Sequence, residues 1–496
     1  MSLLLKAFPH GRPRSRPPVL APVLAPVLVT VLALVVVLLP LAGTAEAKRK
    51  PGSHRDARAH AVAGVIGQPR RNYVIPAGSY FSFPNRKKLE QQAIRKRVLF
   101  TIQSTWGGRR NSLGGPLPTN GKIRIATWSF DDWGIAKALV AARKRGVSVQ
   151  VVAAKSANRG IASWRWLRKR LGSRLYRPGY PSTAAMHSFA RQCRGSCRGP
   201  GGTPHSKFFL FDNVGAAHKR NVVVQSSANL TEMAFQGQWN QAQAMYSVLA
   251  YRDFYAIFRQ MALRRRVAQP YHVKLMGPVT NYFFPRPRAT AALDPVMHNL
   301  NAVNCRGATA GDGSGRTMIR IIQYAMYAER GVWIAKKLRN LWEAGCDVAI
   351  IYSVSSRPVL GILRRRSGRG AVPMRQSVVK DPWGNIVKYN HSKWMTITGN
   401  WNRSTASYLT FSGSANWADP AFGGDEQMQR ILNRSIALRH LGAFAKTWRQ
   451  RTSRPPGSGR VQSFGRTAGV PTSDIPEDVP EEPVFGEGIY RYLPED

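Results

Sequence analysis

The tripeptide His-Ser-Lys occurs twice in this chain of 496 residues, at positions 205–207 and again at 391–393. Displacement at phosphorus through a covalent intermediate needs a nucleophile and, across the phosphate, an acid that protonates the leaving oxygen. Two histidines can supply both groups near neutral pH, and two lysines can hold the non-bridging oxygens and offset their charge. One tripeptide in each half of the chain would supply that set.

The surroundings of the two tripeptides also repeat. The sequences that begin IRIATWSF at 123 and IRIIQYAM at 319 each contain a short β-branched run, a stretch with helical period and a second apolar run. The helical stretches end at Gly146 and Gly345, which predicts a strand, a helix and a strand in each half.

Two further pairs of segments match in the same order. The fragments YFSFPNR at 80 and YFFPRPR at 282 lie near the start of each half. Each tripeptide is followed by a strand pattern and then by NVVVQSSANLT at 221 or YLTFSGSANWA at 408. Matched landmarks in one order indicate an internal duplication.

An α/β fold follows from this duplication. Each half, residues 73–270 and residues 271–455, is expected to hold parallel strands joined by a helix. Two such halves placed face to face would bring both tripeptides to one cleft. The length of the chain also favours two domains or one duplicated unit over a single core.

The sequence resembles the phospholipase D superfamily, whose mark is a duplicated His-x-Lys-x4-Asp motif followed by Gly-Ser-x-Asn. The resemblance covers residues 73–455 and implies two α/β/α sandwich halves, a pseudo-dimer with the active site between them. The matching positions are His205, Lys207, Asp212, Ser226, Ser227 and Asn229 in the first half and His391, Lys393, Gly413, Ser414 and Asn416 in the second, with Glu426 where the family often has a carboxylate.

The resemblance implies a metal-independent phosphodiesterase without a cofactor. By family practice the N-terminal histidine, His205, is the nucleophile that forms a phosphohistidine intermediate, and His391 acts as general acid and then as general base. The other implied roles are phosphate binding by Lys207, Lys393, Asn229 and Asn416, orientation of neighbouring groups by Asp212 and Glu426, and support of the pocket by Ser227 and Ser414.

The sequence departs from the family pattern at three places. Thr398 replaces the aspartate of the second motif, and Ser226 replaces a glycine in the first half. The carboxylate of Glu426 has no clear equivalent in the first half, where Asn240 and Gln241 occupy that region. The lost aspartate puts in doubt a supporting contact more than the histidines and lysines, and it leaves an inactive site as an alternative.

Residues 1–47 predict a secretory signal peptide. Basic residues precede an apolar run over 19–41, and a small-x-small cleavage pattern ends at Ala47. The alternative is a retained membrane anchor, because the run is long enough to span a bilayer, but prolines within the run and the cleavage pattern favour removal near Ala47. We therefore expect a secreted, extracellular protein.

The charge predicts polyanionic partners. The whole chain has a formal net charge of +49, and removal of the signal peptide, with its four basic residues and Glu46, leaves +46. Such a field attracts nucleic acid, anionic lipid headgroups or phosphate-bearing polymers, with solubility alone as the alternative. Residues 48–72 are basic and polar, and residues 456–496 form an acidic Pro-rich tail, so we expect both to be disordered.

The four cysteines predict two disulfides in an exported protein. Cys193 and Cys197 are close enough to close a small loop, and Cys305 and Cys346 would join two segments of the second half. A zinc site at the first pair is the alternative, although its spacing is not that of a standard zinc pair.

The motifs leave the substrate open, because one fold serves many functions. Basic and aromatic segments before each tripeptide could sit in a lipid interface, or could grip a nucleic-acid backbone and stack its bases. Their aromatic residues are Trp164, Trp166, Tyr176, Tyr180 and Trp383. Export and two catalytic repeats favour a monomeric secreted phospholipase D that hydrolyses headgroups at a phospholipid membrane surface. The alternatives are a secreted nuclease of the same superfamily and a catalytically silent polyanion-binding protein.

Overall fold

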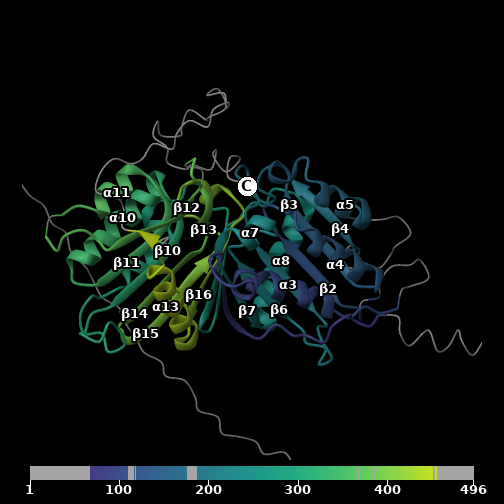
Figure 1. Cartoon of the computed structure of the whole chain (residues 1–496), viewed down its shortest axis with the longest axis horizontal. Coiled ribbons are helices and arrows are strands. Elements are labelled where there is room, and N and C mark those ends of the chain that lie inside the picture. Colours follow the sequence, from purple (N-terminus) through teal and green to yellow (C-terminus); the bar gives the residue numbers. More distant parts are fainter. Residues whose placement is uncertain are drawn as a thin grey trace, which may run out of the picture. The chain divides into compact units, whose positions relative to one another are not determined.

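The computed structural model describes residues 67–109, 117, 119–175, 187–366, 368–383, 386–450 and 453–454. Figure 1 shows the elements that these residues form. The expected signal peptide, most of the basic segment that follows it and the acidic tail lie outside the described residues. Within the described part, no helix combines the length and the apolar character that a membrane span requires.

The first half is built on one mixed sheet. In sheet order its strands are β4 (Phe189–Cys193), β3 (Ser148–Ala154), β2 (Lys122–Ala126), β5 (Phe208–Asp212), β6 (Val222–Ser226), β7 (Gln238–Tyr246) and β1 (Gly78–Ser82). The pairs β4–β3 and β3–β2 are parallel, and the other pairs are antiparallel. The parallel strands are joined by helices, as the strand, helix and strand pattern predicts.

Helices cover both faces of this sheet, so its strands are buried on both sides. The face that carries Phe209 and Phe211 of β5 forms one core, and Phe208 and Leu210 belong to the other core, because successive side chains of a strand point to opposite faces. The first core packs against α3 (Ala93–Ser104), α4 (Trp133–Lys144) and α5 (Ala162–Leu171), and the second packs against α8 (Val248–Leu263). The shorter elements of this half are α2 (Lys88–Gln91), η1 (Ser156–Asn158) and α7 (Glu232–Gln236).

The second half repeats this arrangement. In sheet order its strands are β12 (Met374–Lys380), β11 (Asp347–Ser355), β10 (Met318–Met326), β14 (Lys393–Trp401), β15 (Ser404–Gly413), β16 (Gln427–Leu432), β9 (Val279–Phe283) and β8 (His272–Met276). Its helices and remaining strands are η2 (Ala291–Leu293), α9 (Pro295–Asn301), α10 (Ala328–Glu343), α11 (Arg357–Leu363), α12 (Pro420–Gly423), α13 (Arg434–Trp448), β13 (Ile386–Asn390) and β17 (Ser453–Arg454). Figure 1 shows α10 and α11 beside β10 and β11.

The second sheet is likewise covered on both faces. Side chains of α9, α10 and α11 share one core with Ile319 and Ile321 of β10. Phe444 of α13 shares the other core with Ile322 and Trp394. Each half is therefore an α/β/α sandwich, and the predicted α/β fold with two duplicated halves is confirmed.

The two predicted helix ends are confirmed. Helix α4 ends two residues before Gly146, and α10 ends two residues before Gly345. Both glycines have positive φ angles, +94° and +102°, which L-residues with a side chain rarely adopt. A Cβ atom at Gly146 would also lie 2.5 Å from the carbonyl oxygen of Gly108, so only glycine fits there.

Both predicted disulfides are present. Cys193, the last residue of β4, is bonded to Cys197, and Cys305 is bonded to Cys346, which directly precedes β11. The alternative of a zinc site at the first pair is therefore overturned, because both sulfur atoms are consumed by the disulfide. Among the residues that the structure describes, no group of three or more His, Cys, Asp or Glu side chains is arranged to hold a metal ion.

Candidate active site

Both His-Ser-Lys tripeptides lie at the start of a central strand. The first immediately precedes β5, and the second leads into β14, which begins at Lys393. The Ser-x-Asn segments follow the ends of β6 and β15, which pair with β5 and β14. Since these strand ends are neighbours in each sheet, the His-Ser-Lys tripeptide and the Ser-x-Asn segment of each half lie at the same end of its sheet.

Each tripeptide is anchored to the opposite half. The backbone N–H of His205 donates to the carbonyl oxygen of Asp425 at 2.9 Å, and the hydroxyl of the next residue donates to the same oxygen at 2.9 Å. In the same way, the backbone N–H of His391 donates to the carbonyl oxygen of Trp239 at 2.9 Å, and the following hydroxyl donates to it at 3.2 Å. The halves exchange equivalent contacts, so the two tripeptides meet at one site.

The ring of His205 is held by a carboxylate from the second half. Its Nδ1 atom lies 2.7 Å from Oε1 of Glu426, and the hydroxyl of Ser414 donates to the other oxygen of that carboxylate. All three side chains are buried. Glu426 and Ser414 thus orient one histidine, and the carboxylate fixes its Nδ1 as a hydrogen-bond donor.

The ring of His391 is held by an amide from the first half. Its Nδ1 atom lies 3.2 Å from Oδ1 of Asn240, which also accepts a hydrogen bond from the hydroxyl of Ser227 at 2.7 Å. The strand registers make Asn240 the equivalent of Glu426, because Ser226 pairs with Ala242 and Gly413 pairs with Met428. The first half therefore does have an equivalent of Glu426, and it is a neutral amide.

The two lysines of the tripeptides are buried beside the histidines. The ammonium of Lys207 donates to the carbonyl oxygen of His205 at 2.7 Å, and that of Lys393 donates to the carbonyl oxygen of His391 at 2.9 Å. Lys393 also lies over the ring of Tyr324, 4.8 Å from its centroid. Two ammonium groups so close to the histidines suit an anionic phosphate.

The electrostatics of the site differ between the histidines. Burial lowers the pKa of His205 to about 4, with Glu426 opposing this shift and Lys207 adding to it. Burial, followed by the positive charges of Lys393 and Lys207, holds the pKa of His391 well below its usual range. Burial alone would raise the pKa of Glu426, but the hydrogen bond from His205 and the positive charge of Lys207 help to lower it. Glu426 is therefore ionised and accepts the Nδ1–H of a neutral His205.

The two asparagines of the Ser-x-Asn segments, Asn229 and Asn416, are fully buried at this edge of the sheets. Arg330 helps to place Asn416, because its guanidinium donates to the carbonyl oxygen of Asn416 at 2.9 Å. Arg330 is in turn held by a fully buried ion pair with Asp294, at 3.1 Å.

Asp212, which was predicted among the catalytic residues, lies at the opposite end of β5 from His205. Its carboxylate accepts a hydrogen bond from Arg220 at 2.9 Å and lies 3.9 Å from the ammonium of Lys122, its cross-strand neighbour. At about 3.3 Å per residue, the strand carries Asp212 more than 15 Å beyond Lys207. The structure therefore does not bring Asp212 to the site.

In the second half, Thr398 stands at the position of Asp212, and its surroundings explain why no aspartate is needed there. Thr398 is fully buried, and its cross-strand neighbour on β10 is Met318, where the first half has Lys122. The aspartate and its lysine partner are thus replaced together by an uncharged pair. The departure at Thr398 affects packing at the far end of β14 and leaves the surroundings of His391 unchanged.

Aromatic side chains line the histidines, and the predicted site did not include them. Trp128 packs edge-on against His205 at 5.8 Å between ring centroids, and Tyr324 lies 4.8 Å from His391. Tyr389 also packs edge-on against His391 at 6.1 Å. Trp128 and Tyr324 occupy the same place in the two repeats, five residues after the first isoleucine of IRIATWSF and IRIIQYAM, and this match is the signal that could have identified them.

The aromatic residues expected at a lipid or nucleic-acid surface divide into two groups. Trp164 lies on the buried face of α5, so that expectation was wrong for it, whereas Trp383, near the turn between β12 and β13, is 84% exposed. Trp166 is partly buried, and Tyr176 and Tyr180 lie outside the described residues. Trp383 remains a candidate surface anchor.

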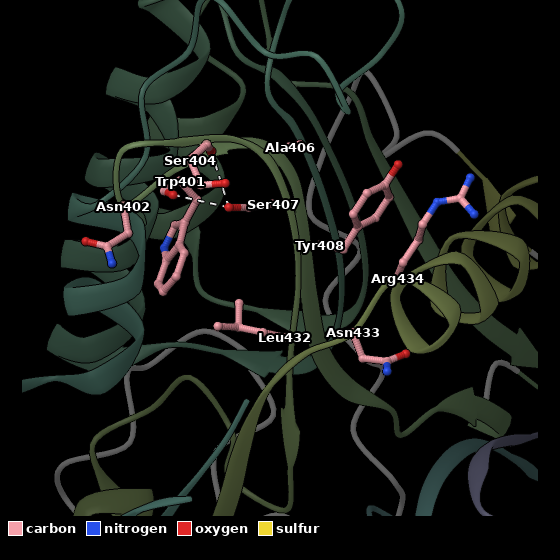
Figure 2. A pocket seen from close by; sticks show the side chains of 9 residues that line it. All are labelled: Trp401, Asn402, Ser404, Ala406, Ser407, Tyr408, Leu432, Asn433 and Arg434. Atoms are coloured by element: carbon pink, nitrogen blue, oxygen red, sulfur yellow. Dashed lines mark hydrogen bonds between the residues drawn. The ribbon is translucent and has the colours of Figure 1, made fainter. Parts of the chain in front are cut away.

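Two cavities of the described structure lie away from the histidines. One of about 410 Å³, drawn in Figure 2, is lined by the β14–β15 turn and the start of α13, with Trp401 and Asn402 on one side and Tyr408 and Arg434 on the other. Another, of about 420 Å³, lies between the ends of β7 and β16 that are distant from the site. Neither cavity is lined by a predicted site residue.

Several solved structures can be aligned with this chain. The phosphatidylserine synthase of Haemophilus influenzae aligns with a TM-score of 0.48 and 12% identity over 81% of this chain and 92% of that one. A polyphosphate kinase from Porphyromonas gingivalis aligns with a TM-score of 0.46 and 13% identity over 75% of this chain, which spans half of the kinase. Nuc, a phospholipase D family member from Salmonella typhimurium, has 18% identity, a TM-score of 0.25 and 98% of its own length covered, but only 36% of this chain.

Sequence comparison finds a family match in the first half of the chain. No curated protein sequence matches the chain. Residues 119–262, which include the first His-Ser-Lys tripeptide and the first Ser-x-Asn segment, match the family described as cardiolipin synthase, PLD-like domain. The match shows that these residues of the first half form a PLD-like domain.

Proposed function

We propose that the protein is a metal-independent phosphodiesterase that works through a phosphohistidine intermediate. The observation that carries the proposal is the reciprocal pair of ring contacts, His205 with Glu426 and His391 with Asn240, each across the two halves. Two histidines oriented from opposite sides and flanked by two buried lysines suit a nucleophile and an acid on either side of one phosphate.

The unequal partners favour His205 as the nucleophile. Attack of its Nε2 atom on phosphorus forms a P–N bond and leaves a positive charge on the ring, which still carries the proton on Nδ1. The carboxylate of Glu426 offsets that charge. The leaving oxygen departs with its electron pair and takes a proton from His391.

His391 suits the acid and base roles. Its partner, Asn240, is neutral and stabilises an imidazolium less than a carboxylate would, so a protonated His391 readily gives up its proton. A substrate phosphate beside the two lysines would offset their charge and raise the pKa of His391 toward the range in which it is protonated. In the second step, His391 accepts a proton from water, the water oxygen bonds to phosphorus, and the P–N bond to His205 breaks.

A phospholipid headgroup is the proposed substrate, and secretion after cleavage near Ala47 is part of the proposal. The family description of residues 119–262 names a cardiolipin synthase, and cardiolipin is itself a phospholipid. The exposed Trp383 lies near Lys380, Asp381 and Lys388 on the β12–β13 hairpin, and an exposed tryptophan with neighbouring lysines suits an anionic membrane surface. The hairpin also carries Tyr389, which packs against His391.

A nuclease is the second candidate, and the net charge of +49 favours it. A silent polyanion-binding protein would have the same charge without turnover. Substrate tests must therefore include nucleic acid as well as lipid.

Headgroup release tests the proposal directly. The mature protein is incubated in EDTA with vesicles of phosphatidylcholine or phosphatidylglycerol, alongside His205→Asn and the control His440→Asn. His440 is an equally buried histidine in α13. We expect release in EDTA by the wild type and the control and none by His205→Asn.

The opposite outcomes are equally informative. If the wild type releases no headgroup but cleaves DNA or RNA in EDTA, the lipid assignment is wrong and the nuclease takes its place. If it cleaves neither yet binds both, the silent binder is the better description.

A further inference from the structure

Two glutamines beside the proposed catalytic groups form side-chain hydrogen bonds to the backbone of the opposite half. On the second half, the side chain of Gln427 accepts a hydrogen bond from the backbone N–H of Lys207 at 2.9 Å and donates to the carbonyl oxygens of Lys207 and Ser226 at 3.0 and 3.1 Å. All of these groups are buried. The acceptor and both donors of the amide are thus directed to the first half.

Gln241 makes the same contacts in the other direction. Its side chain accepts a hydrogen bond from the backbone N–H of Lys393 at 3.1 Å and donates to the carbonyl oxygens of Lys393 and Gly413 at 3.2 and 3.1 Å. The strand registers make Gln241 and Gln427 equivalent positions, each one residue after the side chain that holds a histidine ring. The pairing is therefore reciprocal.

Each glutamine joins three parts of the site. Gln427 is covalently next to Glu426, which holds His205, and it binds the backbone of the lysine two residues after that histidine. Its third hydrogen bond reaches Ser226, the last residue of β6, which directly precedes the Ser-x-Asn segment of the first half. A shift of this amide would move the lysine, the Ser-x-Asn segment and the ring partner of the histidine relative to one another.

We propose that Gln241 and Gln427 are positioning residues that align each His-Ser-Lys tripeptide with the opposite half, and that this alignment sets the rate of the chemical step. The inference rests on the proposed phosphodiesterase activity. Neither side chain is assigned a contact with substrate. Misplacement of reacting groups by about 1 Å costs on the order of 100-fold in rate, so the expected effect is on kcat.

The chain offers a matched control in the same strand. Gln243 lies two residues beyond Gln241 in β7 and is also buried, but its side chain bonds within the first half, to Ser79 and to the backbone of Ala244. Replacing either glutamine by leucine removes a buried amide of the same size. The two variants differ in whether the lost hydrogen bonds cross between the halves.

The test measures hydrolysis of bis(p-nitrophenyl) phosphate by the wild type, Gln241→Leu, Gln427→Leu and Gln243→Leu, together with the melting temperature of each. We expect the first two variants to lose about 100-fold in kcat with KM within threefold of wild type, and Gln243→Leu to keep kcat within threefold. Equal losses in Gln241→Leu and Gln243→Leu, or full kcat in Gln241→Leu, would overturn the proposal. If a leucine variant does not fold, the corresponding glutamate variant, which keeps the acceptor for the lysine N–H, is assayed under the same criteria.

A second readout separates this inference from the proposed function. If the wild type does not hydrolyse the diester, the phosphodiesterase proposal fails, and the alignment is then judged by the affinity for tungstate, an oxyanion that serves as a mimic of the transition state, which requires both histidines and both lysines to be aligned. We expect tungstate to bind at least tenfold more weakly to Gln241→Leu than to Gln243→Leu. Equal tungstate affinity in these two variants would contradict the positioning role.

Discussion

The Nδ1 atom of His205 lies 2.7 Å from Oε1 of Glu426, a residue 221 positions further along the chain and in the other half. The equivalent contact of the other histidine joins Nδ1 of His391 to Oδ1 of Asn240 at 3.2 Å, and this partner is a neutral amide. The duplication has therefore kept the geometry of the two ring contacts while making their electrostatics unequal. This inequality leads to the first prediction.

Replacing Glu426 by glutamine should slow formation of the phosphohistidine. The amide keeps an acceptor for Nδ1 but cannot offset the positive charge that develops on His205, so we expect kcat to fall by about 100-fold. Rapid-quench measurement of phosphorylated protein would report the step directly. An unchanged rate of phosphorylation would argue that His205 is not the nucleophile.

Replacing Asn240 by aspartate should act on the other histidine. The new carboxylate would stabilise the imidazolium of His391 and raise its pKa, so the basic limb of the pH profile of kcat should move to higher pH by about one unit. The profile is measured with the soluble diester between pH 5 and 9. A profile identical to that of the wild type would exclude contact between residue 240 and the acid.

The two disulfides should have different effects when each is replaced by a pair of serines. The backbone N–H of Cys197 donates to the carboxylate of Asp425, which precedes Glu426, so loss of the Cys193–Cys197 bond should lower kcat. The Cys305–Cys346 bond closes a loop of 41 residues, and its loss should cost about 4 kcal/mol of stability with little change in kcat. Urea unfolding and diester hydrolysis of both double variants would check this, and the reverse pattern would contradict it.

Asp212 should matter for stability and little for turnover. Its carboxylate is buried and paired with Arg220 and Lys122, so Asp212→Ala should lower the free energy of unfolding by on the order of 1–2 kcal/mol. Because the residue lies at the far end of β5, kcat should stay within threefold of wild type. A loss of kcat without a loss of stability would place Asp212 in the catalytic machinery after all.

Buried neutral histidines should make the protein less stable in acid. Burial lowers the pKa of His440 to about 4, below the value of about 6.5 in an unfolded chain. Between these two values the unfolded state binds more protons than the folded state, so stability is greatest above pH 6.5 and falls as the pH falls toward 4. The variant His440→Gln should lose less stability over that range, by on the order of 2 kcal/mol, in urea titrations at pH 7 and pH 4. Parallel stability curves for the two proteins would contradict this assignment.

Local patterns predicted much of this molecule. The spacing of apolar residues predicted the strand, helix and strand units, and the glycines at 146 and 345 predicted where two helices end. The two histidines and two lysines could be identified because the same tripeptide recurs in the same context. Cysteine number and spacing predicted both disulfides.

The missed features depend on register between strands that are distant in sequence. Asn240 is the equivalent of Glu426 only once β6 is paired with β7 and β15 with β16, and sequence spacing alone did not reveal that alignment. Asp212 matched a family motif, yet a strand of regular rise carries it away from the site. Trp164 looked like a surface aromatic because its neighbours are basic, but the helical period turns it toward the core.

The exchange of contacts between the halves has a consequence for how such a site can change over time. Asn240 belongs to the first half and contacts the histidine of the second half. A mutation in one half can therefore change the reactivity of the histidine in the other half. Two copies of an ancestral unit could then acquire separate tasks without altering either tripeptide. One substitution in a strand of the opposite half would be enough to make one histidine a better acid, while the histidine of the other half remains the better nucleophile.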